Sequence, residues 1–453
     1  MNALFGGARV ELAQTLKPVT PFGGLVVFAE FLRRIGWSEV LTAHWPFGYH
    51  SPNAIPPQQT LTVFLFAVLA GASRFAHGAM LRADLALRET LGLKRCAGDD
   101  AMRAMFGRFG FGEIERLFRP LWAWMLERLP KASSGYILDV DSTVFARCGK
   151  QQGARRGYNP SRRGGRSHHP LLAVLAQCHF VLHAWLRPGD TTANSGVVDF
   201  LRETFELAER AGVRISGLRA DCGFYGQDLL QWLEHRGTAY LIVARKTGRL
   251  LRSIQAIKAW QPLADGEEVG EFTTAVGKWK LQRRFLVLRR IANENDTEPM
   301  LLRISRYVYR VVVTNRTESA AELWREYDGR AQIEQRLREL KDDLHADGFC
   351  MQSFYGSEAA FLSVLCLYNL LGEFQRVTAP GGQWKQPGTL RSQLFVCGAI
   401  LGRRGRQPIL YFSLSWGGLE QRKPLLDALL HWPPPIPPFL EPTQQSDTHQ
   451  EAA

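Results

Sequence analysis

In the stretch Tyr136-Ile-Leu-Asp-Val-Asp141, apolar and polar residues alternate as in a β-strand. The stretch directly follows Gly135, where the helical spacing of apolar residues ends. Further strands are predicted over 170–178, 179–187, 215–221 and 238–244, and helices over 197–211 and 227–235. The resulting order of three strands, helix, strand, helix and strand indicates an α/β domain. Asp141 and Asp221 both end strands, where side chains of an open α/β sheet converge on a ligand.

The regions that flank this core have different patterns. Apolar residues at three-and-four spacing predict helices at 28–37, 61–87 and 100–129. After a β-rich stretch, a strand at 309–314 and a long helix at 319–344 are expected, and the Pro-rich tail is expected to be disordered. The predicted regions are a helical N-terminal region at 1–130, a core at 131–250 and 308–380, a β insertion subdomain at 251–307, and a C-terminal region at 381–453.

The charge balance of the chain indicates a polyanionic partner. The 453 residues include 56 Lys and Arg against 43 Asp and Glu, and a net charge of +13 favours nucleic acid or an acidic membrane surface. The longest apolar run, 61–72, is well short of the ~20 residues that a membrane span needs, and the N-terminus shows no secretory signal. Seven scattered cysteines without a CxxC pair indicate a reducing cytosol and argue against disulfides or structural zinc.

A third candidate carboxylate, Glu334, lies in the run Tyr327-Asp-Gly-Arg-Ala-Gln-Ile-Glu-Gln-Arg-Leu-Arg-Glu-Leu-Lys341. At about 100° per residue, a helix places Tyr327, Arg330, Glu334 and Lys341 on one edge, beside an apolar stripe of Ile333, Leu337, Leu340 and Leu344. The remaining face, which includes Glu339, is charged and is expected to be exposed to solvent.

The three acids Asp141, Asp221 and Glu334 are a suitable set for metal chemistry on phosphodiesters. Carboxylates are hard oxygen ligands for Mg²⁺ or Mn²⁺. Two such ions about 4 Å apart can activate the attacking oxygen and stabilise the leaving oxygen. Arg330 and Lys341 would then contact backbone phosphate, and arginine can do so with two hydrogen bonds.

A basic stretch separates the first two acids. Residues 142–189 contain no Asp or Glu, and a run of one sign beside a carboxylate cluster is typical of a loop that follows phosphates. Tyr158, or Trp279 in the insertion, could stack on an unpaired base. The arginines that we expect to contact phosphate are Arg155, Arg156, Arg162, Arg163 and Arg166.

Each of these residues also has a structural interpretation. An aspartate at a strand end is often a turn or cap residue, and Glu334 alone would more often be half of a surface ion pair. Asp139, on the same side of its strand as Asp141, is either a structural partner or a secondary ligand. His168 and His169 lack a partner at metal-ligand spacing, and Trp279 is more often a packing residue. Only the ordered set of three acids favours the catalytic interpretation.

The same residues resemble a known family. Tyr327, Arg330, Glu334 and Lys341 match the Y-(2)-R-(3)-E-(6)-K signature of a superfamily of bacterial insertion-sequence DDE transposases. The stretches Leu138-Asp-Val-Asp-Ser-Thr143 and Arg219-Ala-Asp-Cys-Gly-Phe224 resemble its first-acid and second-acid motifs. The runs Gly157-Tyr-Asn-Pro160, His169-Pro-Leu-Leu172 and Leu186-Arg-Pro-Gly189 are similar to the subgroup called transposase DDE domain group 1. The resemblance covers roughly residues 20–380.

This resemblance implies an RNase H-like mixed sheet with a β-rich insertion, flanked by helical N- and C-terminal regions. It implies a DNA transposase that uses two Mg²⁺ ions, or Mn²⁺ instead, on Asp141, Asp221 and Glu334, with Tyr327 orienting DNA near the cut. The partners would be double-stranded DNA (terminal inverted repeats bound by the N-terminal part, and target DNA) and a second copy of the chain. The place of action would be the bacterial cytoplasm, at the nucleoid and not at a membrane.

The reaction implied by the family is hydrolytic nicking, release of the element and strand transfer by a 3′-hydroxyl. Some relatives carry Trp directly after the signature arginine, where this chain has Ala331, so the resemblance does not extend to a base-stabilising role or a hairpin intermediate. Two alternatives stay open at this point. One is an RNase H-like nuclease or resolvase that cuts without joining, and the other is a catalytically inactive, transposase-derived DNA-binding repressor.

Overall fold

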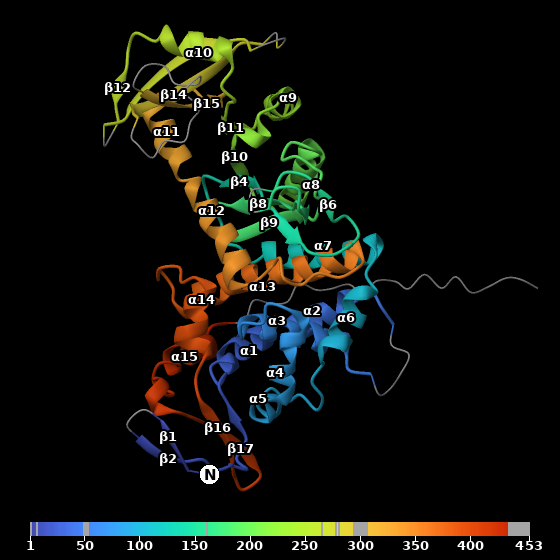
Figure 1. The fold of residues 1–453 in the computed structure, drawn as a ribbon. Coiled ribbons are helices and arrows are strands. Elements are labelled where there is room, and N and C mark those ends of the chain that lie inside the picture. Colours follow the sequence, from blue (N-terminus) through green and yellow to red (C-terminus); the bar gives the residue numbers. More distant parts are fainter. Residues whose placement is uncertain are drawn as a thin grey trace, which may run out of the picture. The chain divides into compact units, whose positions relative to one another are not determined.

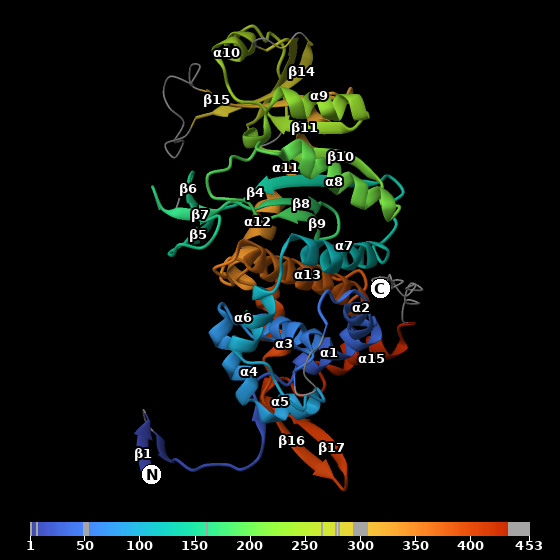
Figure 2. The ribbon, with the colours of Figure 1, turned by 90° about the vertical axis from the view of Figure 1, so that its right-hand side faces the viewer.

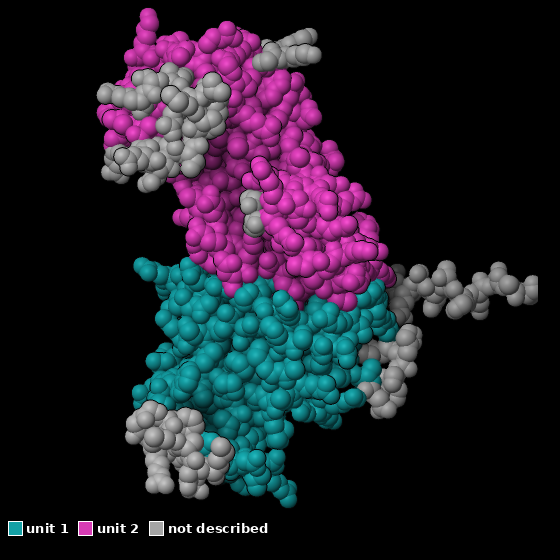
Figure 3. All heavy atoms as spheres, viewed as in Figure 1, with its two compact units in different colours: residues 1–108, 343–345, 374–453 teal, residues 109–342, 346–373 magenta. Residues whose placement is uncertain are grey.

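The computed structural model describes residues 2–5, 8–48, 54–159, 162–263, 266–276, 279, 281–292 and 307–433 (Figure 1). The chain divides into two compact units (Figure 3). The first consists of residues 1–108, 343–345 and 374–453, and the second of residues 109–342 and 346–373. The predicted Pro-rich tail after Pro433 and part of the predicted insertion, residues 293–306, lie outside the described residues.

A nine-stranded mixed sheet forms the centre of the second unit. In sheet order its strands are β12 (Gln261–Pro262), β13 (Glu268–Thr274), β14 (Arg283–Ile291), β15 (Tyr307–Thr314), β11 (Ala239–Val243), β10 (Ile215–Ala220), β4 (Tyr136–Ser142), β8 (Leu171–Leu175) and β9 (Phe180–Trp185). β4, β8 and β9 form an antiparallel meander, and β10 and β11 continue the sheet parallel to β4. The RNase H-like mixed sheet that we expected is therefore confirmed.

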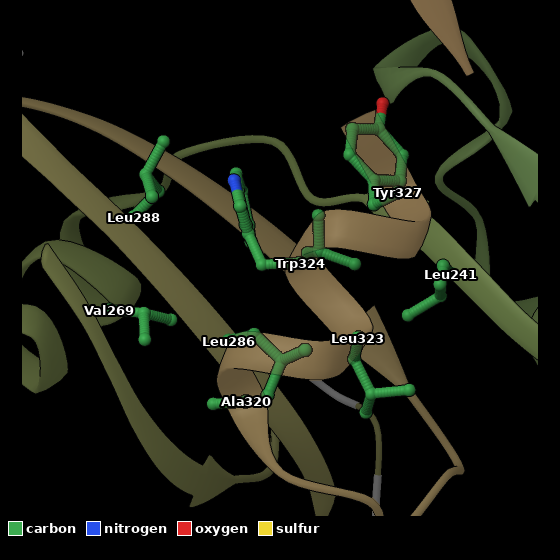
Figure 4. Packing of buried hydrophobic residues seen from close by; sticks show 9 residues of the cluster. Leu241, Val269, Leu286, Leu288, Ala320, Leu323, Trp324 and Tyr327 are labelled. Carbon is green, nitrogen blue, oxygen red and sulfur yellow. The ribbon is translucent and has the colours of Figure 1, made fainter. Parts of the chain in front are cut away.

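The strands of the insertion belong to this same sheet. β15 pairs antiparallel with β11 on one side and with β14 on the other, so β13 and β14 extend the sheet instead of forming a separate one. Helix α11 (Ala320–Asp328) packs on these strands through a hydrophobic cluster (Figure 4). The cluster comprises Leu241, Val269, Leu286, Leu288, Val312, Ala320, Leu323, Trp324 and Tyr327.

The segment predicted as one long helix, 319–344, is divided into three parts. α11 begins at a capping box, in which Ser319 and Glu322 satisfy each other's backbone N–H groups. After Gly329 and Arg330 the chain resumes as α12 (Ala331–Arg338) and continues directly into a π-helical turn, η4 (Glu339–Asp343). The prediction of an uninterrupted helix was therefore wrong, although most of the segment is helical.

Helices α7 (Phe111–Leu126) and α13 (Phe354–Thr378) lie side by side (Figures 1 and 2). Both reach strand β9, because Trp122 Nε1 donates to the Val181 carbonyl at 2.9 Å and Asn369 Nδ2 donates to the same oxygen at 2.9 Å. α13 is long and apolar enough to cross a membrane, but 83% of its most apolar window is buried inside the protein, as in the core helix of a soluble domain. The remaining helices of this unit are α8 (Val197–Arg210), α9 (Gln227–Arg236) and α10 (Gly248–Gln255).

The first unit is mostly helical and also contains strands from both ends of the chain. Its helices are α1 (Leu25–Arg34), α2 (Trp37–His44), α3 (Pro57–Leu69), η1 (Phe75–Gly78), α4 (Ala79–Ala83), α5 (Leu85–Thr90), α6 (Asp99–Gly107), α14 (Pro387–Leu390), η5 (Arg391–Phe395), η6 (Leu414–Trp416) and α15 (Lys423–His431). Its strands are β1 (Asn2–Phe5), β2 (Ala8–Glu11), β3 (Val19–Thr20), β16 (Ala399–Arg404) and β17 (Gln407–Phe412). The helix predicted at 61–87 is not continuous, because the chain leaves α3 at Gly71, whose φ is 101°.

Candidate active site

Two neighbouring parallel strands place the first two acids together. In the pairing of β4 with β10, Asp139 lies opposite Arg219 and Val140 lies opposite Ala220. Asp141 is the next residue on β4, and Asp221 directly follows the end of β10. Asp221 caps a short 3₁₀ turn, η2 (Cys222–Phe224), and its Oδ1 accepts a hydrogen bond from the Gly223 N–H at 2.8 Å. Both carboxyls therefore lie at the same edge of the sheet, as the sequence predicted.

The Asp141 carboxyl is buried and responds to the other two acids. Its Oδ1 accepts from the Ser142 N–H at 2.7 Å, and its Oδ2 accepts from Arg330 Nη2 at 3.0 Å. Burial raises the pKa of Asp141 to about 6; the charges of Asp221 and Glu334 raise it as well, whereas the Arg330 cation opposes them. Asp221 and Glu334 are therefore close enough to Asp141 to influence its ionisation.

Glu334 and Lys341 lie on the helical segment that follows Arg330. Glu334 lies in the first turn of α12 and is exposed, and Lys341 lies in η4 and is half-buried. Within the described part of the chain, neither side chain makes a hydrogen bond or an ion pair, so neither is committed to a structural contact. Both groups are therefore available to bind a ligand.

Arg330 and Tyr327 are fixed by the protein itself. Arg330 is 7% exposed and lies at the junction of α11 and α12, where it bonds to Asp141. The ring of Tyr327 packs at 5.8 Å from Trp324, and Figure 4 shows its hydroxyl pointing away from Ala320 and Leu323. Burial raises the pKa of Tyr327 to about 12, so its hydroxyl stays protonated at neutral pH.

The donor set at this edge fits a divalent cation. The three carboxylates supply the oxygen ligands that Mg²⁺ and Mn²⁺ prefer, and a bound cation would offset the repulsion that raises the pKa of Asp141. In the described residues, however, no three Asp, Glu, His or Cys side chains are already arranged to hold a metal ion. Ligation by all three acids therefore requires Glu334 and the two aspartates to come closer together.

Asp139 is the structural partner, which resolves the alternative left open by the sequence. Its side chain is fully buried, and its two oxygens accept from Arg219 Nε at 2.7 Å and Nη2 at 2.8 Å. Arg336 Nη1 lies 3.8 Å from the same carboxylate. Asp139 is therefore committed to an internal ion pair with Arg219, whereas Asp141 at the strand end is 9% exposed and keeps some access to solvent.

The expectation that Glu339 lies on an exposed face was wrong. Glu339 is 2% exposed, and its Oε2 accepts a hydrogen bond from the Tyr368 hydroxyl at 2.8 Å. Arg336, three residues before Glu339, is 1% exposed as well. The break between α11 and α12, at Gly329 and Arg330, changes the helical phase of the residues that follow it. The face that a continuous α-helix would expose is therefore partly turned into the protein.

The five arginines predicted to contact phosphate form an exposed group, which we call the basic ridge. The ridge lies on and around the small sheet of β5 (Phe145–Arg147), β7 (Arg166–His168) and β6 (Arg155–Arg156). Arg155, Arg156, Arg162, Arg163 and Arg166 are all exposed, and Tyr158 among them is 73% exposed. Arg155 forms an exposed ion pair with Asp190 at 3.0 Å, which is weak enough to be exchanged for phosphate.

Other residues of the basic stretch have structural roles. Arg187 is buried and donates to the backbone carbonyls of His169, Thr192 and Ser195. Burial lowers the pKa of His168 to about 4, so it is neutral and accepts a hydrogen bond from Arg147 Nε at 3.0 Å. These contacts join residues that are distant in sequence, and sequence patterns do not reveal them.

Two aromatic or imidazole side chains near the site are also explained by packing. Trp279 packs on Tyr225, with ring centroids 5.2 Å apart, and lies under the Arg283 guanidinium at 5.4 Å, so it acts as a packing residue. His169 Nδ1 donates to the Thr191 carbonyl, which leaves Nε2 to accept from the Ser142 hydroxyl at 3.1 Å. Sequence analysis missed this link, which holds the residue that follows Asp141.

Comparisons with known proteins give one family match. A family model described as transposase DDE domain group 1 matches residues 3–430. No protein of curated function matches the chain. Among solved structures, a cryo-EM structure of a piggyBac transposase synaptic complex with hairpin DNA is similar, with a TM-score of 0.44 and 11% sequence identity over 92% of this chain and 85% of that chain.

Proposed function

Since this chain belongs to the family transposase DDE domain group 1, we propose that it cuts DNA at the ends of an insertion sequence and joins those ends to target DNA. The observation that supports a catalytic role is the pairing of β4 with β10, which puts Asp141 and Asp221 at the same edge of the sheet, together with the bond from Arg330 to Asp141. Arg330 directly precedes α12, the helix that carries Glu334. Acids that come from elements far apart in the sequence must meet in this way to share metal ions.

In the proposed mechanism Asp141, Asp221 and Glu334 would hold two Mg²⁺ ions, for which Mn²⁺ could substitute. When bound, the ions would activate the attacking oxygen and stabilise the leaving oxygen of a phosphodiester. Arg330 and Lys341 bind the phosphate on either side of Glu334, and Arg330 already provides a cation at Asp141. The protonated hydroxyl of Tyr327 donates a hydrogen bond that orients the DNA near the cut.

The proposed DNA contacts extend beyond the site. The basic ridge follows the phosphate backbone, and the exposed Tyr158 stacks on an unpaired base. The helical N-terminal region, residues 1–130, binds the terminal inverted repeats, and two copies of the chain hold the two ends. Hydrolytic nicking, release of the element and strand transfer by a 3′-hydroxyl then follow, in the bacterial cytoplasm at the nucleoid.

Glu334→Gln tests this function. We expect Mg²⁺-dependent cleavage of DNA carrying the inverted repeats that bound the gene to fall by more than about 100-fold, the upper end of the loss caused by residues that only support a metal ligand. Because Glu334 is exposed and unpaired in the described structure, the free energy of unfolding should change by less than about 0.5 kcal/mol. Gel assays of cleavage and urea denaturation measure the two quantities.

Asp342→Asn is the matched control, because Asp342 is an exposed acid just beyond α12 that is not part of the proposed site. It should cut DNA at the wild-type rate. An unchanged cutting rate in Glu334→Gln would overturn the assignment. Cleavage without strand-transfer products would identify a nuclease or resolvase, and DNA binding without cleavage under any metal would identify a repressor.

A further inference from the structure

A buried group of three charged residues lies beneath the site. Asp139, Arg219 and Arg336 are 0%, 5% and 1% exposed, respectively, and we call them the buried triad. Asp139 carries one negative charge between two arginines, with a bidentate bond from Arg219 and a distance of 3.8 Å to Arg336. Burying such ions is costly, and apolar residues of similar volume often stabilise a protein equally well. Stability alone therefore does not account for the triad.

The two arginines attach the segment that carries Glu334 to the sheet, one before Glu334 and one after it in the sequence. Arg219 Nη1 donates to the carbonyl of Glu326 in α11, eight residues before Glu334. Arg336 is itself on α12, two residues after Glu334, and its Nη2 donates to the Ala176 carbonyl beyond β8. The sheet thus holds this segment at a point before Glu334 and at a point after it, and Asp139 is common to both attachments.

The connection between α11 and α12 lies tightly against the triad. A Cβ atom at Gly329 would lie 2.8 Å from Arg219 Nη1, so the chain approaches the guanidinium more closely than a side chain would permit. On the strand side, Asp139 and Arg219 are register partners of β4 and β10, each two residues before a candidate metal ligand. The Asp139–Arg219 ion pair therefore links the two strands that lead to the aspartates with the helix that precedes Glu334.

We propose that Asp139 is a positioning residue which, through Arg219 and Arg336, anchors the segment that carries Glu334 to the strands of Asp141 and Asp221, from where the three acids close together on divalent metal. This inference rests on the proposed function. Asp139 does not touch the metal or the DNA. Residues that orient metal ligands from behind typically change metal affinity by about 10- to 100-fold when they are replaced.

Asp139→Asn tests the role, because asparagine has nearly the same shape but lacks the charge that holds both arginines. Isothermal titration calorimetry of the full chain with MnCl₂ alone should give an affinity for Mn²⁺ at least about tenfold weaker than that of the wild type. Binding to inverted-repeat DNA in EDTA should be unchanged, since the basic ridge does not include the triad. Urea denaturation of each variant gives the accompanying change in stability.

Glu373→Gln is the matched control. It removes another buried bidentate pair of the same unit, in which Arg128 Nε and Nη2 donate to Glu373 at 2.7 and 2.8 Å. We expect a comparable loss of stability with wild-type affinity for Mn²⁺. Equal weakening of Mn²⁺ binding in both variants, or wild-type binding in Asp139→Asn, overturns the inference.

Arg219→Lys is the second variant, to be used if Asp139→Asn does not fold. Lysine keeps the charge but cannot bond to Asp139 bidentately and to Glu326 at once. It should also weaken Mn²⁺ binding at least about tenfold, and wild-type affinity would overturn the inference. The proposed function fails if the wild-type protein neither binds Mn²⁺ nor cuts DNA. This outcome differs from failure of the inference, which is judged by comparing the variants with a wild type that does bind Mn²⁺.

Discussion

The carboxyl of Asp141 is buried, bonds to Arg330 and is within electrostatic range of two further acids. A carboxyl in such surroundings is stabilised in its neutral form by burial and in its charged form by a cation. Without metal the only cation bonded to it is Arg330, among the residues that the structure describes. A bound divalent ion adds positive charge at the same carboxyl, so protons and metal compete for Asp141.

This competition predicts the pH dependence of metal binding. The pKa of Asp141, raised to about 6 by burial and by the neighbouring acids, means that its carboxyl is mostly protonated below pH 6 and cannot act as a ligand. The affinity for Mn²⁺ should therefore fall as the pH decreases through about 6, as measured by calorimetry between pH 5 and pH 8. An affinity that is constant down to pH 5 would contradict the assigned burial of this group.

Stability without metal should follow the opposite trend. The folded-state pKa of about 6 lies above the ordinary aspartate pKa of 3.8, so the folded protein holds this proton more tightly than the unfolded chain does. The contribution of Asp141 is thus fully present below about pH 4 and is lost as the pH rises through 6. Asp141→Asn removes this loss, worth on the order of 3 kcal/mol, so urea denaturation of both proteins at pH 4 and 7 isolates it.

At this scale the sequence identified the acids but not their partners. The spacing of Asp139 and Asp141 places them on one side of a strand, and nothing in the spacing shows which one is free. Asp139 is the one held in an internal ion pair, because it bonds to Arg219. Arg219 is 80 residues away in the chain and meets Asp139 only when β4 pairs with β10. The burial of Glu339 was likewise hidden, because its partner Tyr368 is on another helix.

Among the elements, the basic ridge provides a quantitative prediction about DNA binding. Each exposed arginine that neutralises a phosphate releases a counterion and adds about 0.9 to the slope of log affinity against log salt concentration. Replacing Arg156, Arg162 and Arg163 by glutamine should therefore lower that slope by up to about 3. Fluorescence anisotropy with labelled inverted-repeat DNA, at several salt concentrations in EDTA, measures it.

The control for this prediction carries the same change in net charge elsewhere. Arg202, Arg210 and Arg252 are exposed residues of α8 and α10, outside the ridge. Their replacement by glutamine should leave the slope near the wild-type value. Equal losses in the two triple variants would show that total charge, and not the ridge, determines binding.

The elements themselves were largely predictable, whereas their pairing was not. Alternating and apolar runs identified β4, β8, β9, β10, β11 and β15 close to their observed bounds. The same patterns cannot show that β14 pairs with β15. Alternation shows which face of the sheet each side chain lies on, but not which other strand lies beside it. The break at Gly329 and the π-helical turn were also missed, since apolar spacing assumes a constant helical period.

For the whole molecule, the number of sites per chain predicts the stoichiometry of the DNA complex. The proposed acids form one set per chain, whereas an insertion sequence has two ends to cut. We expect complexes of Glu334→Gln with Mg²⁺ and paired inverted repeats to contain two protein copies and two DNA ends, as measured by mass photometry. A complex with one copy that holds both ends would contradict the proposed dimer.

The position of β15 in the sheet also has a consequence for protein synthesis. β15 lies between β11 and β14, yet it follows the whole insertion in the chain. A ribosome that has translated the chain through β11 has already made both aspartates, but neither the strand that covers β11 nor the helix with Glu334. Under the proposed mechanism, nascent or prematurely terminated chains lack the third metal ligand. If that mechanism holds, such incomplete chains cannot cut DNA.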